Sequence, residues 1–418
     1  MNRNLRVTAG VFAASAALLA ASVPAGAAGF KVDAIMKNDL KLHTAPSPQL
    51  EMGGSSFDGP LAQAAQTQWN ADNHKAAFAT YAITKSGTGR SGAISGAYNI
   101  GFSDFPLNQV AGSPDVGPGS PNPTKTVADF VQVPIDLGGV AIIYHFGSGV
   151  SGTLAGILRK YPLTLNGSTL GKIFAGKVTN WDSKAIAATN PHAVVKGKDL
   201  LPNLPIVVTS RTSGSGTTFI YKDYLSQVDH ADFASPDANA FAAAGSATFA
   251  NSGLLAAAVQ STTGAIGYVE YGYAVANGTP TISLVNKSGK DVALTEAGIV
   301  QAATAGLKYI DQHGGFNTNS LTHFEINNEV GASVYPIAGF SYAIMYRNQT
   351  NRTNAIAEVK FLDFLSHQGG GKTTATRFGQ DLADANGYAP MPVTVQAVAR
   401  AILLGVKVGG KVVLNSTD

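Results

Sequence analysis

The sequence predicts an α/β fold built mainly from parallel sheets. Beyond Lys160, segments with the alternating pattern of strands take turns with segments that have the periodicity of amphipathic helices. Such alternation is typical of β-α-β layers, in which helices cover parallel strands. The chain has 418 residues, of which 45% are hydrophobic. It is therefore long enough for about two or three domains with substantial cores.

The expected elements begin after a short loop at residues 53–56. The apolar stripe of Leu61, Ala64, Ala65 and Trp69 then predicts a helix. Strands are expected at 77–83, 98–102, 130–134, 140–144, 205–209, 265–269 and 340–346. Further helices are expected at 181–189, 217–228, 252–260, 353–367 and 393–404. The chain has no internal repeat, which excludes a repeat architecture.

Residues 1–28 have the features of a secretory signal peptide. Arg3 and Arg6 supply a positive start, an Ala-rich apolar stretch follows, and small residues allow cleavage near Ala27 or Ala28. A membrane anchor is the alternative, but the apolar stretch is short for a membrane span. We therefore expect an exported protein, either periplasmic or secreted.

Cysteine content and charge narrow the classes further. The chain contains no cysteine, which excludes disulfides, thiolate metal sites and a lipid anchor on an N-terminal cysteine. After the leader no segment reaches about 18 consecutive apolar residues, so we expect a soluble mature chain. The net charge is +3 without a basic run, so no nucleic-acid partner is expected. Residues 29–50 are weakly periodic and are expected to form a linker.

An arginine and several hydroxyl groups meet in a glycine-rich loop at residues 211–218 (Arg-Thr-Ser-Gly-Ser-Gly-Thr-Thr). The loop lies between an expected strand and an expected helix. The first turn of a helix carries free N–H groups and a partial positive charge, both of which suit an oxyanion. Arginine adds a rigid fork of donors. A flexible Ser/Gly turn with a capping serine is the alternative, and the motif alone leaves both open.

Two further glycine-rich motifs resemble nucleotide-binding sequences. Residues 87–92 match G-x-G-x-x-G after an expected strand, the pattern of a nicotinamide- or flavin-dependent enzyme. The next strand follows after about six residues, which is short for a crossover helix, so a second anion loop with Ser86 in front is favoured. Residues 369–374 lack the first glycine of a P-loop, because Ser366 stands there, and a helix ending in a turn is favoured.

Metal and hydrolase signals are absent from the sequence. The eight histidines are scattered without H-x-H or H-E-x-x-H spacing, and there is no G-x-S-x-G motif. We expect no metal, no cofactor and no catalytic residues. Asp104, within residues 101–107 (Gly-Phe-Ser-Asp-Phe-Pro-Leu), is the remaining acidic candidate, although an aspartate by itself is typical of a turn or a helix cap.

Taken in order, these segments resemble the phosphate-binding proteins that serve Pst-type ABC importers. The resemblance extends over roughly residues 52–400. It is carried by residues 53–57, 86–89, 102–107, 130–142, 173–182 (IFAGKVTNWD), 264–271 (GAIGYVEY) and 387–392 (GYAPMP). Each stretch alone is only a weak indication of the family. The resemblance rests on the fact that all of them occur in the family's order.

The resemblance implies a two-lobe periplasmic binding protein of type II-like architecture, with a hinge between the lobes. One lobe would hold residues 50–132 plus 337–418, and the other residues 133–336. Such a protein is not an enzyme. It would capture inorganic phosphate, deliver it to the membrane permease subunits of an ABC transporter, and act as a monomer.

The family's phosphate-binding positions fall on residues from both lobes, with the backbone N–H as the donor at Phe57. They are Ser56, Phe57, Ser86, Asp104, Arg211, Ser215, Gly216 and Thr217. Hydroxyl and N–H groups would donate to the anion, and Arg211 would supply charge. Asp104, as a carboxylate, can only accept. It would accept from hydrogen phosphate and reject sulfate, which has no proton to give.

Two positions depart from the family pattern. Ser213 stands where relatives carry an aspartate that supports the arginine, so Arg211 would be more mobile or more strongly positive toward the ligand. Asp58 either caps the following helix or points into the cleft and weakens binding, with Lys85 as a compensating charge. A receptor for sulfate, molybdate or a phosphonate, a secreted phosphatase and a dinucleotide-dependent enzyme remain as alternatives.

Overall fold

The computed structural model describes residue 40 and residues 42–73, 77–110, 113–241, 246–312, 326–369 and 378–413. The expected signal peptide, the first part of the expected linker and residues 370–374 of the third glycine-rich motif lie outside this part of the chain. Within it, no helix is both long enough and apolar enough to cross a membrane.

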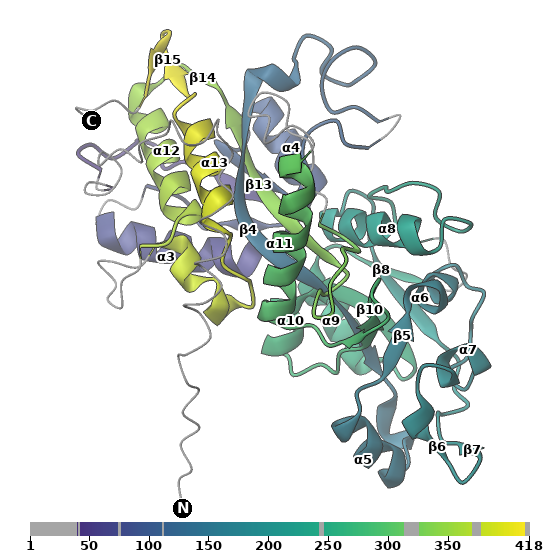
Figure 1. The fold of residues 1–418 in the computed structure, drawn as a ribbon. Helices are drawn as coiled ribbons and strands as arrows, with labels where there is room; N and C mark the ends of the chain where they lie inside the picture. Colours follow the sequence, from purple (N-terminus) through teal and green to yellow (C-terminus); the bar gives the residue numbers. More distant parts are fainter. Residues whose placement is uncertain are drawn as a thin grey trace, which may run out of the picture.

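One eight-stranded sheet has the strand order β2-β1-β3-β13-β4-β10-β8-β9. Figure 1 labels its strands β13, β4, β10 and β8, with β4 extending from one half of the molecule to the other. Its strands are β1 (Met52–Gly54), β2 (Ala82–Ile83), β3 (Ile100–Ser103), β4 (Phe130–His145), β8 (Val207–Arg211), β9 (Ala247–Phe249), β10 (Ala265–Glu270) and β13 (Ala338–Tyr346). Parallel pairs lie at both ends of the sheet, as the alternating pattern predicts. The three central pairs, β3–β13, β13–β4 and β4–β10, are antiparallel.

Strand β4 passes from one half of the molecule to the other. It pairs with β13 up to Gly139 and with β10 from Val140 onward. The expectation of two strands, at 130–134 and 140–144, is wrong, because these residues form one strand of 16 residues. Pro134 is tolerated at a register shift, opposite Tyr342. Gly138 leaves room for a ring, since a Cβ there would lie 2.4 Å from the Phe57 side chain.

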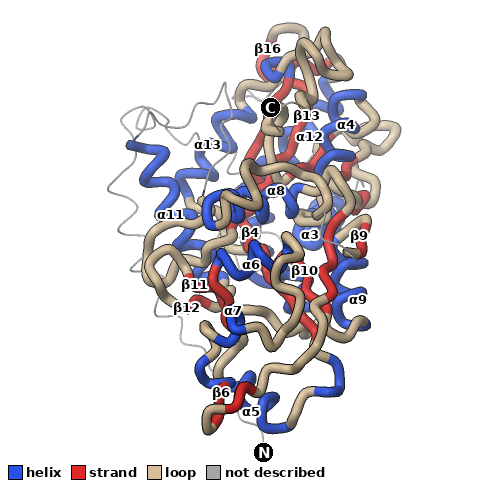
Figure 2. Tube along the Cα trace, turned by 90° about the vertical axis from the view of Figure 1, so that its right-hand side faces the viewer, coloured by secondary structure: helices blue, strands red, loops and turns tan. Residues whose placement is uncertain are grey.

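Helices cover the sheet in both halves of the molecule. Figure 2 shows that the molecule is elongated, with α12 and α13 toward one end and α5 near the other. They are α3 (Gly59–Asn73), α4 (Ser86–Ser95), α5 (Gly152–Lys160), α6 (Gly167–Phe174), α7 (Lys184–Ala187), α8 (Gly216–Val228), α9 (Ser252–Ser261), α10 (Tyr271–Ala276), α11 (Glu296–Gln312), α12 (Arg352–Ser366) and α13 (Val393–Leu403). The expected helices are present, although that at 181–189 shortens to α7.

Small sheets complete the outer parts. Their strands are β5 (Thr164–Asn166), β6 (Val194–Val195), β7 (Lys198–Asp199), β11 (Ser283–Val285), β12 (Asp291–Val292), β14 (Asn348–Gln349), β15 (Lys407–Val408) and β16 (Lys411–Val412). They form the sheets β12-β11-β5, β14-β15-β16 and β6-β7, separate from the central sheet.

The motif at residues 87–92 is helical and not a loop, which corrects the sequence interpretation. It lies inside α4, which begins at Ser86. Its glycines allow the helix to touch the sheet, since a Cβ on Gly89 would lie 2.0 Å from the carbonyl oxygen of Phe102. Close helix–strand packing therefore explains the glycines, and the loop that a dinucleotide site requires does not exist here.

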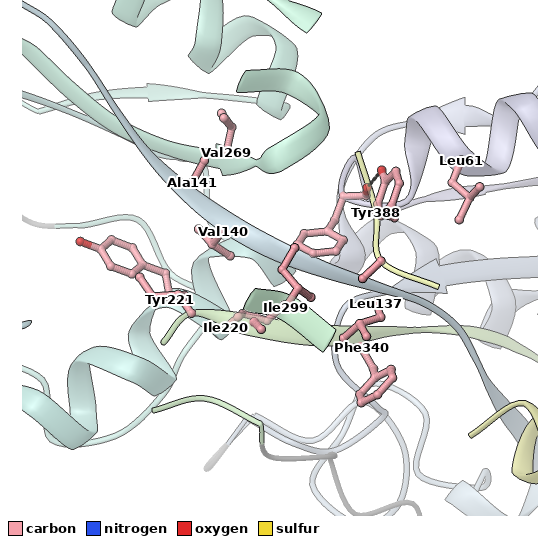
Figure 3. Packing of buried hydrophobic residues seen from close by; sticks show 14 of the residues in the cluster. Leu61, Leu137, Val140, Ala141, Ile220, Tyr221, Val269, Ile299, Phe340 and Tyr388 are labelled. Carbon is pink, nitrogen blue, oxygen red and sulfur yellow. Dashed lines mark hydrogen bonds between the residues drawn. The ribbon is translucent and has the colours of Figure 1, made fainter. Parts of the chain in front are cut away.

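A continuous apolar core surrounds β4 on both sides of its midpoint. Figure 3 shows Leu137 and Val140 of this strand close to Phe340, Ile299 and Ile220, which come from three different elements. All five side chains are fully buried. This packing buries the middle of β4, where the two halves meet and where polar residues lie beside the strand.

Candidate functional site

Four helices begin close to one another beside the middle of the sheet. Ser86 is the first residue of α4, Gly216 of α8 and Ser252 of α9, while Asp58 directly precedes α3. The Gly216 N–H donates to Ser86 Oγ at 3.1 Å, and the Oγ atoms of Ser252 and Ser56 lie 3.1 Å apart. Each helix N-terminus carries partial positive charge and unsatisfied N–H groups, so their convergence creates a region suited to an anion.

Arg211 lies at the centre of this region and is 1% exposed. It is the last residue of β8, so the strand fixes its backbone, whose N–H donates to the Tyr268 hydroxyl at 3.1 Å. Its guanidinium donates to Ser56 Oγ at 2.9 Å, to Ser252 Oγ at 2.7 Å and to the Ala250 carbonyl at 3.0 Å. Arg211 Nε has no hydrogen-bond partner among the described residues. The guanidinium is therefore held in place with one donor still available.

Glu270 joins the arginine to the start of α8. Its Oε1 accepts from Ser252 Oγ and from Thr217 Oγ1, both at 2.8 Å. The same serine hydroxyl accepts from Arg211, so the chain of bonds runs from guanidinium to hydroxyl to carboxylate. Glu270 Oε2 is buried without a partner in the described part of the chain. Sequence reasoning did not single out Glu270 or Ser252, although Glu270 lies within the motif at residues 264–271.

Ser86 and Asp104 face the first turn of α8 from the other half of the molecule. Ser86 Oγ accepts from the N–H groups of Gly216 and Asp104, at 3.1 and 3.3 Å, which leaves its hydroxyl proton free to donate. A Cβ on Gly216 would lie 2.3 Å from Ser86 Oγ and 2.4 Å from Asp104 Oδ2. The halves are therefore closed on each other here, and Gly87 N–H donates to the Gly214 carbonyl at 2.8 Å.

Three aspartates and one serine lie close together on the sheet side of the site. Asp104 directly follows β3, and its Oδ1 accepts from the Ser341 hydroxyl at 3.2 Å. Ser341 pairs with Asp136 across the β13–β4 ladder. Asp58 interacts with both Asp136 and Asp104. Asp104 Oδ2 and both carboxyl oxygens of Asp58 and Asp136 lack partners among the described residues.

Burial raises the pKa of every carboxyl group in this region. It raises the pKa of Asp104 to about 7, with the charges of Glu270 and Asp136 adding and Arg211 opposing. Burial likewise raises the pKa of Asp136 to about 6. Burial and the neighbouring charges of Asp136 and Asp104 raise the pKa of Asp58 well above its usual value. For Glu270, burial raises the pKa and Arg211 opposes the shift.

The remaining expected residues lie in the same region with their own local partners. Phe57 N–H, expected as a phosphate donor, donates to Ser55 Oγ at 3.0 Å. Ser215 caps α8, since its Oγ accepts from the Thr218 N–H at 3.3 Å. A capping serine was the alternative interpretation of the loop at residues 211–218, and the structure shows that the cap and the converging donors coexist there.

The two departures from the family pattern are placed clearly by the structure. Ser213 is exposed, and Arg211 is buried between other partners, so the loss of an aspartate at position 213 has not freed the guanidinium. Asp58 does not cap α3 through its side chain; both its carboxyl oxygens are buried without a partner. Lys85 reaches across to the Ser213 carbonyl at 2.7 Å and so joins the two halves.

Comparisons with known proteins agree on one family. The family profile described as "PBP superfamily domain" matches residues 41–368. The phosphate-binding protein PstS of Xylella fastidiosa is 27% identical over 351 residues, covering 83% of this chain and 82% of that protein. The phosphate-binding protein PstS 2 of Mycobacterium tuberculosis is 28% identical over 318 residues, covering 76% of each chain.

Solved structures share the fold at low sequence identity. A high affinity periplasmic phosphate-binding protein (PfluDING) bound with phosphate aligns with TM-score 0.56 and 18% identity, covering 84% of this chain and 93% of that one. A phosphate-binding protein from Stenotrophomonas maltophilia aligns with the same TM-score and identity, covering 85% of this chain and 94% of that one. A putative phosphate ABC transporter substrate-binding protein from Clostridium perfringens, with bound phosphate, aligns with TM-score 0.50 and 18% identity, covering 82% of this chain and 100% of that one.

Proposed function

Because this chain belongs to the PBP superfamily, we propose that it binds inorganic phosphate between its two lobes and delivers it to an ABC importer. The relatives and similar structures are phosphate-binding proteins by name, and one is described as a substrate-binding protein of an ABC transporter. In this proposal the protein is non-catalytic and exported, and it acts as a monomer on the permease subunits.

One observation of the structure supports the proposal most strongly. The starts of four helices and a buried arginine meet in one closed region, where Arg211 Nε is buried with no partner in the described part of the chain. An anion that accepts from these groups would satisfy them in a place that excludes water, where charge-assisted bonds are strong. The proposed phosphate contacts are Ser56, Phe57, Ser86, Asp104, Arg211, Ser215, Gly216 and Thr217.

Asp104 supports phosphate over sulfate. Its Oδ2 is buried without a partner among the described residues and lies against Gly216 at the start of α8. Above the raised pKa of Asp104, about 7, hydrogen phosphate can donate a proton to this oxygen, whereas sulfate would leave two negative groups facing each other. The lobes, proposed as residues 50–132 plus 337–418 and residues 133–336, would open and close about β4.

Calorimetry on the purified mature protein tests the proposal. We expect heat of binding with inorganic phosphate at a Kd in the micromolar range or tighter, equivalent to about −8 kcal/mol or more negative. Sulfate, molybdate and a simple phosphonate form the comparison set. Tight binding of sulfate without phosphate, or hydrolysis of a phosphate ester by the protein, would refute the proposal in favour of another oxyanion receptor or a phosphatase.

A further inference from the structure

The sheet register places Asp136 at the phosphate site. Asp136 lies opposite Ser341 in the β4–β13 ladder, and directly opposed residues share a face of the sheet. Gly138 lies two residues further along β4 and so points to the same face. A Cβ on Gly138 would lie 2.4 Å from the ring of Phe57. The face of β4 that carries Asp136 is therefore the face against which residues 57 and 58 pack.

The carboxyl groups of Asp58 and Asp136 interact directly with each other, and the hydroxyl of Ser341 lies beside both. Both side chains are at most 1% exposed, and none of their four oxygens makes a hydrogen bond of ordinary geometry with the described residues, although the hydroxyl of Ser341 lies near both groups and partly opposes the rise of their pKa. The Ser341 hydroxyl donates its single proton to Asp104, so it cannot also donate fully to the pair. Two ionised carboxylates without donors would be very costly to bury together. A proton shared between them removes that cost, because one carboxyl then donates to the other.

Further charged and titratable groups surround the pair. Asp104, directly after β3, and Glu270, at the end of β10, add negative charge. In the described part of the chain, two buried cations lie beside these carboxyl groups: Arg211, and Arg90, which donates to Ser103 and forms an ion pair with Asp115. Besides Ser341, the hydroxyls of Tyr81 and Tyr388 lie near the pair. Tyr388 donates to the Phe57 carbonyl and Tyr81 to the Ser55 carbonyl, so these two phenol protons are committed elsewhere.

We propose that Asp58 and Asp136 form a proton-sharing pair that couples phosphate binding to proton uptake. The inference rests on the proposed function, because it concerns the same site. A phosphate anion that enters beside Asp104 brings negative charge close to the pair. The pair then holds its proton more firmly, and a proton from solvent is taken up where the pair was ionised before. Phosphate affinity therefore rises as the pH falls from about 8.5 to 6.

Calorimetry with inorganic phosphate, in buffers of different ionisation enthalpy, measures the protons taken up per ligand. The proteins compared are the wild type, Asp58→Asn, Asp136→Asn and the double variant. Glu358→Gln is the matched control, since Glu358 is also buried with its pKa raised to about 7, but it lies on α12 beside Asn99. Because phosphate itself titrates equally in every experiment, the ratio of variant to wild-type Kd isolates the pair.

We expect the wild type to take up more protons per bound phosphate than the double variant, with a difference of at most one proton. Glu358→Gln should take up as many protons as the wild type. The ratio of the double variant's Kd for phosphate to that of the wild type should change by up to about tenfold per pH unit between pH 6 and 8.5. Equal proton numbers and parallel pH profiles in wild type and double variant would overturn the inference. If the double variant does not fold, the two single variants replace it: a shared proton predicts that each of them takes up less proton per phosphate than the wild type, because each lacks one of the two carboxyl groups that share it. Absence of any phosphate heat in the wild type at all pH values would instead refute the proposed function.

Discussion

The two walls of the proposed site differ in how their polar groups are satisfied. The donor wall consists of Arg211, Ser252 and the first turn of α8, and the acidic wall consists of Asp58, Asp104 and Asp136. In the donor wall the guanidinium makes three hydrogen bonds to protein oxygens at 2.7 to 3.0 Å. In the acidic wall five of the six carboxyl oxygens have no donor among the described residues.

This difference separates affinity from selectivity. A donor wall that is already ordered attracts any oxyanion without a further cost of reorganisation. An acidic wall without donors repels every anion that brings no proton, and the cost is high because the wall is buried. We therefore expect substitutions in the donor wall to change affinity for all oxyanions, and substitutions in the acidic wall to change discrimination and pH dependence.

Arg211→Ala should give the largest effect, a loss of phosphate affinity of about 10³-fold or more. It removes several charge-assisted bonds, each worth about 1.5–3 kcal/mol, and leaves Glu270 without its neighbouring cation. Calorimetry measures the loss. Arg347→Ala is the control, since Arg347 binds the carbonyls of Ala128 and Phe130 away from the site. Phosphate binding by Arg211→Ala within tenfold of wild type would show that the donor wall does not contact the ligand.

Asp104→Asn should reduce discrimination between phosphate and sulfate by roughly 10²-fold or more. An amide can donate to sulfate, and it removes a buried negative charge that faces the ligand. Competition of sulfate against phosphate, measured at pH 7.5 in wild type and variant, gives the ratio. An unchanged ratio would contradict the role of the acidic wall, even if the affinity for phosphate itself has changed.

The pair Asp58 and Asp136 should make the ligand-free protein less stable as the pH rises. Burial raises the pKa of both groups, that of Asp136 to about 6, so the folded state binds protons more tightly than the unfolded state from about pH 4 to at least pH 6. The free energy of unfolding then falls across that window, by about 3 kcal/mol for a shift like that of Asp136. Urea unfolding at pH 5 and pH 8 measures this change.

The Asp58→Asn, Asp136→Asn double variant should lose most of that fall and gain stability at pH 8. Asp291→Asn, at an exposed position, serves as the control and should follow the wild type. If the stability of the double variant depends on pH as steeply as that of the wild type, the groups that bind these protons are not Asp58 and Asp136.

Gly216→Ala should weaken phosphate binding by about tenfold to a hundredfold. The added methyl group meets Ser86 Oγ at 2.3 Å and Asp104 Oδ2 at 2.4 Å, so the two walls must move apart. Overpacking of this kind typically costs about 1–3 kcal/mol. Gly156→Ala, at a position on α5 where a Cβ meets an arginine nitrogen at 3.8 Å, is the matched control. An affinity equal to wild type would mean that the walls are not this close when phosphate is bound.

Local sequence patterns predicted the donor wall better than the acidic wall. A strand followed by a glycine-rich start of a helix placed Arg211 and Gly216 where the structure has them, because both depend on neighbouring residues along the chain. Ser252 was missed because its role depends on contacts with Ser56, 196 residues away. The N-cap Asn251 before it was the available signal, since it marks a further helix N-terminus.

The acidic wall depends on sheet register, which the sequence did not reveal. The sequence pattern predicts two strands, at 130–134 and 140–144, and leaves Asp136 between them. In the structure the strand continues, and its pairing with β13 brings Asp136 opposite Ser341. A single sequence does not specify which strands pair at a distance of some 200 residues. The fold class followed from alternation, but the antiparallel centre of the sheet depends on such pairings.

Ser213→Asp tests how independent the donor wall is of its surroundings, and it should change phosphate affinity by only a few-fold. Ser213 is exposed and its carbonyl accepts from Lys85, whereas Arg211 is already held by three other acceptors. A new carboxylate at this position is therefore solvated and partly balanced by Lys85, and exposed ion pairs contribute about 0–1 kcal/mol. Ser213→Asn, measured alongside by calorimetry, separates charge from shape. A hundredfold loss of phosphate affinity in Ser213→Asp but not in Ser213→Asn would mean that a surface charge at position 213 changes how Arg211 binds the anion. The donor wall would then depend on its surroundings more than its hydrogen bonds indicate.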